Sequence, residues 1–225
     1  MPAKRNGRLC MTILALEFSS PQRSVAVVRD GQMAEAIEVG AGGTNAFKMI
    51  EQVLAEAKIE REQIEAIAVG LGPGSYAGIR AAISLAQGWQ LARGVKLLGV
   101  SSAECLVGQA QSEKILGRAS VVIDAQRNEF YLASYEIARN GWREIAPLKI
   151  LTRAEIQSRA EADEILIGPE VTRWFHGGRI VFPRAAALVE LAARRGDSAP
   201  NQDLEPIYLR ETNFVKSPPR RPGAR

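Results

Sequence analysis

A glycine-rich turn between an apolar strand and a long helix is the feature that most constrains the fold of this chain. The turn has the sequence GLGPGSYAGIR over residues 70–80, after an apolar run at 64–70 and before a proline-free stretch that continues to residue 93. Gly72 and Gly74 can adopt the positive φ angles that side chains resist. Ser75 is a typical N-cap residue. A strand, a tight turn and a helix in this order predict an α/β protein.

The same turn is a candidate anion site. Backbone N–H groups at a helix start point outward, and the helix dipole favours a phosphate or a carboxylate there. The turn is neither a Walker loop nor a GxGxxG dinucleotide fingerprint, so backbone and short side chains would have to supply the contacts. An equally good interpretation is that the turn only bends the chain tightly. The residues that we predict near a phosphate or nucleotide are Gly72, Gly74, Ser75, Arg80 and Ser19.

Length and cysteine content favour a cytoplasmic protein with a sizeable core. With 225 residues, the chain is long enough for one large domain or two small lobes. Cys10 and Cys105 lie far apart and show no CxxC spacing, which suits a reduced compartment. The apolar run at 13–16 ends at Glu17, too early for a signal sequence or a membrane span. We therefore expect no association with a membrane.

The basic charge of the chain is concentrated at its ends. Of 29 basic and 25 acidic residues, residues 1–8 and 210–225 hold eight basic residues and one acidic residue. The body of the chain, with 21 basic and 24 acidic residues, is slightly acidic. We expect residues 1–10 to be a flexible extension and residues 211–225 to be a basic, proline-rich tail. Such a tail can contact RNA phosphates, although a solvated tail is the more ordinary interpretation.

The two halves of the chain repeat one order of elements. Apolar runs and turn residues predict three antiparallel strands, a helix and a further strand in each half, with an Asp30-Gly31 hairpin turn in the first. This order predicts an α/β fold with two lobes built on mixed sheets, the first over 11–110 and a smaller one over 111–210. The predicted strands are 12–18, 24–29, 33–39, 64–70, 96–100, 120–123, 129–137, 142–150, 164–167 and 179–181, and the longer predicted helices are 45–58, 77–93, 152–160 and 184–195, with another beginning at Ser101.

Five motifs, in their order along the chain, resemble those of the TsaB (YeaZ-like) family. TsaB is the bacterial subunit needed to make threonylcarbamoyladenosine on tRNA. The resemblance spans residues 13–210 and implies the actin-like, Hsp70-like, sugar-kinase-like (ASKHA) fold. Where the family usually has Asp-Thr-Ser after the first strand, this chain has Glu17-Phe18-Ser19. The motifs are ILALEFSS at 13–20, GLGPGSYAGIR at 70–80, GVSS at 99–102, DAQRNEFY at 124–131 and PIYLR at 206–210.

The resemblance implies a noncatalytic scaffold subunit. Such a subunit forms a heterodimer with a TsaD-like catalytic subunit and supports threonylcarbamoyl transfer to the adenosine beside the anticodon of ANN-decoding tRNAs. A TsaE-like ATPase is the expected third subunit. We expect ATP or ADP to bind at the face that the subunits share, rather than as a cofactor of this chain. When the chain is alone, it could form a homodimer.

Two helices are the predicted partner interface. In the resembled family the first two helices face TsaD, and here Gly78, Ala82 and Ala86 recur every four residues as a ridge of small side chains, against which another helix can pack closely. We expect Ala82→Glu to abolish the heterodimer while leaving the fold intact. The complete predicted set is Phe47, Ile50 and Leu54 on the first helix and Gly78, Ala82, Ala86 and Trp89 on the second.

The sequence offers few candidate residues for catalysis. The resembled TsaD proteins hold a metal with a His-x-x-x-His pair, whereas this chain has one histidine, His176, so we predict no metal site and no catalytic residue. A protease mechanism has only that one candidate base. We expect Asp124 and Arg127 to form a turn-stabilising ion pair. The alternative hypothesis is a self-sufficient ATP-dependent phosphotransferase of the sugar-kinase type, which needs a nucleotide site across both lobes.

Overall fold

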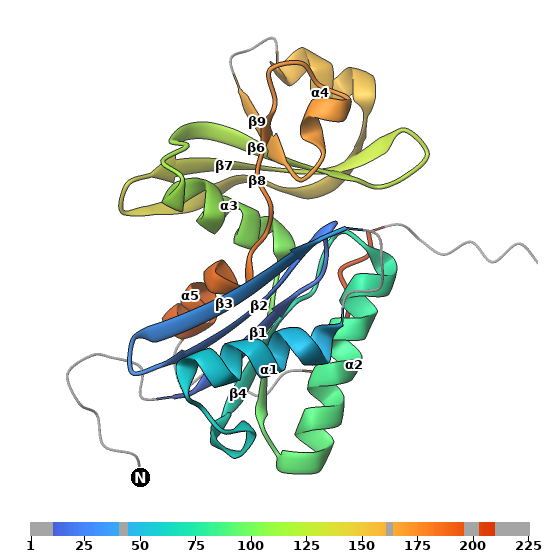
Figure 1. Ribbon diagram of the computed structural model, residues 1–225. Coiled ribbons are helices and arrows are strands. Elements are labelled where there is room, and N and C mark those ends of the chain that lie inside the picture. Colours follow the sequence, from blue (N-terminus) through green and yellow to red (C-terminus); the bar gives the residue numbers. More distant parts are fainter. Residues whose placement is uncertain (1–10, 41–44, 161–163, 196–202, 210–225) are drawn as a thin grey trace, which may run out of the picture.

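Two five-stranded mixed sheets, one above the other in Figure 1, form the frame of the molecule. The computed structural model describes residues 11–40, 45–160, 164–195 and 203–209. The predicted N-terminal extension and basic tail lie outside these residues. Within the described part of the chain, no helix is both long enough and apolar enough to cross a membrane.

The two sheets share one topology. In the first sheet the order is β3-β2-β1-β4-β5, with β1, β2 and β3 antiparallel and β4 and β5 parallel to β1. In the second sheet the order β10-β9-β6-β7-β8 repeats that pattern. The predicted recurrence of three antiparallel strands, a helix and a further strand is confirmed, and the further strand is parallel to the first. The strands are β1 Ile13–Glu17, β2 Gln22–Arg29, β3 Gln32–Val39, β4 Ala66–Gly70, β5 Lys96–Val100, β6 Gly117–Asp124, β7 Glu129–Ala138, β8 Gly141–Thr152, β9 Ile165–Gly168 and β10 Arg179–Ile180.

Helices α1 (Ala46–Ala57) and α2 (Tyr76–Arg93) cover one face of the first sheet. The Asn45 side chain caps α1 by accepting the Lys48 N–H at 3.1 Å, and Ser75 caps α2 by accepting the Gly78 N–H at 3.3 Å. Between the two helices lies a short 3₁₀ helix, η1 (Arg61–Gln63). Apolar residues of both helices share a core with every second residue of the strands beneath them.

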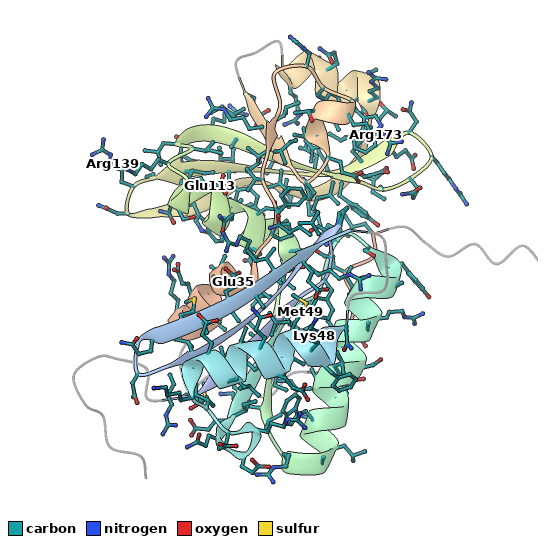
Figure 2. All side chains as sticks on the ribbon, viewed as in Figure 1. Glu35, Lys48, Met49, Glu113, Arg139 and Arg173 are labelled. Carbon is teal, nitrogen blue, oxygen red and sulfur yellow. The ribbon has the colours of Figure 1, made fainter. Side chains whose placement is uncertain are left out.

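The other face of the first sheet is covered by α5 (Ala185–Arg195), which comes from the far end of the chain. Two side chains of the sheet hold the start of this helix: the Ser24 hydroxyl accepts the Ala185 N–H at 2.8 Å, and the Glu35 carboxylate accepts the Ala186 N–H at 3.1 Å. Glu35 also pairs with Arg184. Figure 2 shows Glu35 beside α5. A carboxylate at this position also suits the positive end of the helix dipole.

Helix α3 (Ser102–Ser112) packs on the second sheet, where Leu106 and Val107 share a core with Val121 of β6. The opposite face of that sheet is covered by α4 (Arg153–Ala160) and the 3₁₀ helix η2 (Val171–Arg173). The predicted lobes group each helix with its sequence neighbours, whereas packing places α3 on the second sheet and α5 on the first. The two helices also contact each other, so they join the two halves.

Candidate functional site

The glycine-rich turn is packed against the chain that follows β1. Gly72 and Gly74 have positive φ angles of 87° and 148°, as the sequence predicts. A Cβ atom at Gly74 would overlap the Ser19 carbonyl oxygen, and one at Gly78 would overlap the Phe18 carbonyl oxygen. The Ser75 N–H donates to the Ser19 carbonyl at 2.7 Å. Glycine is therefore required at Gly74 and Gly78 because two backbone segments touch there.

A buried carboxylate lies beneath this turn. Glu17, at the end of β1, is 0% exposed and accepts the Ser19 N–H at 2.8 Å and the Ser102 hydroxyl at 3.1 Å. Ser102 in turn accepts the Gly72 N–H at 3.1 Å. Gly70 leaves room for the carboxylate, which a Cβ at that position would overlap. Burial raises the pKa of Glu17, while the hydrogen bonds from Ser19 and Ser102 oppose that rise.

Three backbone donors of the predicted phosphate site are bonded inside the protein. The Gly72 N–H is bonded to Ser102, the Ser75 N–H to Ser19, and the Ser19 N–H to Glu17. Arg80 lies apart from this network: its guanidinium is 4.6 Å from the centre of the Tyr76 ring. The structure thus brings Gly74, Ser75 and Ser19 together but not Arg80. A nucleotide near these residues stays a prediction.

The predicted ridge of small residues on α2 faces the first sheet of the same chain. Gly78, Ala82 and Ala86, which we call the inner ridge, are all buried. Ala82 and Ala86 belong to the core beneath α1 and α2. A charge at Ala82 would therefore enter this core, contrary to the expectation that Ala82→Glu leaves the fold intact.

The other predicted interface residues divide between core and surface. Ile50 and Leu54 of α1 are buried in the same core as the inner ridge. Phe47 is 63% exposed, and Trp89 is half-buried at the edge of that core. Of the seven predicted interface residues, Phe47 and Trp89 are the two that reach the surface, and their contact with a partner stays a prediction.

A second stripe of small residues lies on the outer side of α2. Ala77, Ala81, Ser84 and Gly88, the outer ridge, are exposed along its length. A Cβ at Gly88 would meet no atom within 4 Å. Further along the same side, Leu91 is 91% exposed. This stripe was not predicted, although its spacing of three and four residues is visible in the sequence.

A groove of about 300 Å³ lies beside the outer ridge, between α1 and α2. Its walls are mostly apolar, with charged residues of η1 and the end of α2 at one side. Exposed apolar grooves are frequent at sites where proteins bind one another. We call the outer ridge, Leu91 and this groove the docking surface. The groove is lined by Phe47, Ile50, Arg61, Glu62, Trp89, Ala92 and Arg93.

His176 and the pair of Asp124 and Arg127 are the remaining predicted chemical groups. His176 is exposed after η2. Asp124 accepts the Gln126 N–H at 2.8 Å, and among the described contacts its partner is Gln126 rather than the expected Arg127. Glu164, buried on the second sheet, accepts the Ser120 hydroxyl at 2.8 Å and lies between two arginines. Within the described ranges, no group of three or more His, Cys, Asp or Glu residues could hold a metal ion.

Comparison with known proteins places this architecture in a family. The protein-family model described as "TsaD: tRNA N6-adenosine threonylcarbamoyltransferase" matches residues 44–193 of this chain. The tRNA threonylcarbamoyladenosine biosynthesis protein TsaB of Escherichia coli is 25% identical over 228 residues, which cover 93% of this chain and 99% of that protein. The solved structure of YeaZ from Pseudomonas aeruginosa is 28% identical with a TM-score of 0.75, covering 88% of this chain and 100% of that one.

A shorter match reaches a transferase. The tRNA N6-adenosine threonylcarbamoyltransferase of a Geobacter species is 34% identical over 113 residues, which are 42% of this chain and 33% of that enzyme. The two-sheet architecture agrees with the actin-like fold expected from the sequence. Because the family model covers well over half of the chain, and because relatives matched along their whole length are TsaB and YeaZ, the chain belongs to the TsaD-type threonylcarbamoyltransferase family and to its TsaB group.

Proposed function

We propose that this chain is a noncatalytic scaffold subunit in tRNA threonylcarbamoyladenosine biosynthesis, and that its docking surface binds a TsaD-like catalytic subunit. The partner transfers the threonylcarbamoyl group to the adenosine beside the anticodon, and this chain supports that transfer. The full-length TsaB relatives, which are named for this pathway, support the pathway assignment. The exposed outer ridge of α2 is the observation that carries the docking role.

The chemistry of the docking surface suits a helical partner. Small residues at Ala77, Ala81 and Gly88 let another helix approach α2 closely, because no long side chain separates the two backbones. Leu91 and Phe47 supply exposed apolar groups at the rim, and burying them would stabilise the contact. The outer ridge is thus free to contribute to an interface without withdrawing any residue from the core.

The family match indicates what kind of partner fits. The matched residues 44–193 include both α1 and α2, so a TsaD-like protein is expected to present a related helix pair. Two related pairs that face each other form a four-helix contact around an approximate twofold axis. The same geometry would join two copies of this chain when the partner is absent.

The enclosed position of the Glu17 carboxylate supports the scaffold role. Its carboxylate is enclosed by Ser19, Ser102 and Gly70, and turn N–H groups are bonded within the chain. A magnesium–nucleotide complex would need this network to open. We therefore assign ATP or ADP, together with a TsaE-like ATPase, to the face that this chain shares with its partner.

The docking role is tested by Ala81→Glu. A carboxylate at this exposed position would be buried without a partner on docking, so the full-length chain should bind the TsaD-like subunit of the same organism at least about tenfold more weakly. Isothermal titration calorimetry measures the affinity, and thermal unfolding should show an unchanged midpoint.

Ala154→Glu is the matched control, because Ala154 is an exposed alanine on α4 of the second sheet. This variant should bind the partner as the unsubstituted chain does. In a strain that depends on the plasmid-borne gene, the modified nucleoside should fall with Ala81→Glu and persist with Ala154→Glu. Full affinity of Ala81→Glu for the TsaD-like subunit would refute the docking surface.

A further inference from the structure

An exposed aromatic cluster lies at the start of α2. The rings of Tyr76 and Tyr208 are stacked, with their centres 5.5 Å apart and their planes 26° apart. Tyr76 is 58% exposed and Tyr208 is 39% exposed. The guanidinium of Arg80 lies over the Tyr76 ring and also contacts its hydroxyl. Two exposed tyrosines and an arginine are thus held together on the surface.

The partner of Tyr76 in this stack comes from the last described segment, residues 203–209. Leu204 is buried in the core of the first sheet, and the Ile207 N–H donates to the Leu71 carbonyl at 2.8 Å. Figure 1 shows this segment beside the end of α2 that carries the glycine-rich turn. The segment is therefore fixed at two points before Tyr208, so the stack is assembled in advance of any ligand.

The tyrosine cluster is separate from the groove of the docking surface, whereas Tyr76 and Arg80 lie beside the outer ridge. Arg80 and Trp89 are nine residues apart, and at about 100° per residue they lie on opposite sides of α2. Trp89 lines the groove against α1, whereas Arg80 lies over Tyr76, whose ring stacks on Tyr208. A ligand at the cluster would leave the groove accessible.

Positive charge follows directly after the cluster. Residues 210–225 contain five basic residues and one acidic residue, and they begin two residues after Tyr208. The other 209 residues contain 24 basic and 24 acidic residues, so the whole net charge of +4 belongs to this final segment. The basic residues are Arg210, Lys216, Arg220, Arg221 and Arg225.

We propose that Tyr76, Tyr208 and Arg80 form a stacking platform for an unpaired base of single-stranded RNA. Exposed tyrosine rings stack on nucleobases, and a guanidinium beside them contacts either a base or a phosphate. The net positive charge that the sequence carries after Leu209 favours a polyanion over a protein partner. The platform goes beyond the docking role and does not depend on it, because Tyr76, Tyr208 and Arg80 belong to neither the groove nor the outer ridge.

Fluorescence anisotropy with the full chain tests the platform, using a labelled single-stranded RNA of about 10 nucleotides. Tyr208→Ala should weaken binding by about tenfold, because the stacking ring is lost. Tyr208→Phe should retain the affinity for RNA, because phenylalanine keeps the ring. Tyr208→Leu should lose it, because leucine keeps an apolar side chain at this position but has no ring to stack on a base. Arg80→Ala should weaken binding and reduce its dependence on salt.

Arg139→Ala is the charge control, because Arg139 is exposed at the end of β7 on the second sheet, away from α2 (Figure 2). It removes the same charge as Arg80→Ala and should leave the affinity for RNA nearly unchanged. Thermal unfolding midpoints of all variants establish that the fold persists. Photo-crosslinking of the same RNA with 4-thiouridine should label a peptide that contains Tyr76 or Tyr208.

Three results would overturn the platform. They are equal affinity of Tyr208→Ala and the unsubstituted chain, crosslinks confined to other surfaces, and retained RNA affinity of Tyr208→Leu. If Tyr208→Ala weakened binding of the TsaD-like partner but not binding of RNA, the cluster would be a protein contact instead. Failure at Tyr208 leaves the Ala81→Glu result untouched, so the two proposals fail separately.

Discussion

On the inner face of α2, Gly78, Ala82 and Ala86 lie against the first sheet, whereas on the outer face Ala77, Ala81 and Gly88 are open to solvent. The two stripes have almost the same composition and spacing. Their surroundings differ completely: a Cβ at Gly78 overlaps the Phe18 carbonyl oxygen, and a Cβ at Gly88 meets nothing. A small residue is thus required on one face by the chain's own backbone and is available on the other for a partner.

This comparison separates two reasons for a small side chain in a helix. The inner ridge lets α2 approach the strand end and turn, so its residues belong to the folding of the chain. The outer ridge makes no such contact, so its residues add little to stability. Substitutions on the inner face should therefore change stability first, and substitutions on the outer face should change association first.

The largest expected effect is that of Ala82→Glu. Ala82 is fully buried among apolar residues, so a glutamate there would place a charge without a partner in the core. We expect a loss of about 4 kcal/mol or more in the free energy of unfolding, measured by urea denaturation. Ala81→Glu, one residue away, should change it by less than about 0.5 kcal/mol. Similar stability of the two variants would abolish the distinction between the faces.

An intermediate effect is expected from Glu17→Gln, beneath the inner face. Burial raises the pKa of Glu17, so the folded chain keeps this proton to a higher pH than the unfolded chain does. The associated stability is present at low pH and is lost as the pH rises through the folded pKa. The amide of glutamine remains neutral, accepts from Ser19 and donates to Ser102.

Urea denaturation of both proteins from about pH 5 to about pH 8 measures this effect. The stability of Glu17→Gln relative to the unsubstituted chain should increase with pH, by about 1.4 kcal/mol for each unit by which the pKa is raised. A constant difference across this range would show that the carboxylate ionises as an exposed one does, and that the turn does not enclose it.

The smallest effect is expected from Gly88→Ala on the outer face. Alanine favours a helix over glycine by up to about 1 kcal/mol, and the added methyl group meets open space. We therefore expect this variant to unfold at a slightly higher temperature, as measured by circular dichroism. A lower unfolding temperature would mean that the outer ridge is not open in the isolated chain.

Local signals in the sequence predicted most of the elements. The Asp30-Gly31 turn joins β2 and β3, and Ser75 caps α2 as expected. Apolar runs and turn residues located the strands of both sheets, and the five motifs led to the TsaB group. The contact between Glu17 and Ser102 was not predicted, because it joins residues 85 positions apart that come together only when α3 begins beside the turn.

The sequence by itself determined the strands, the helices, the repeated sheet order and the family, because these depend on short-range patterns and ordered motifs. The tertiary structure alone decided which side of α2 is buried, because small residues line both sides and give no strong hydrophobic periodicity. It also decided that α3 packs on the second sheet and α5 on the first, the reverse of what the predicted lobes imply. The stacking of Tyr208 on Tyr76 was likewise decided only by the tertiary structure. These features follow from how the two sheets and the returning chain pack together.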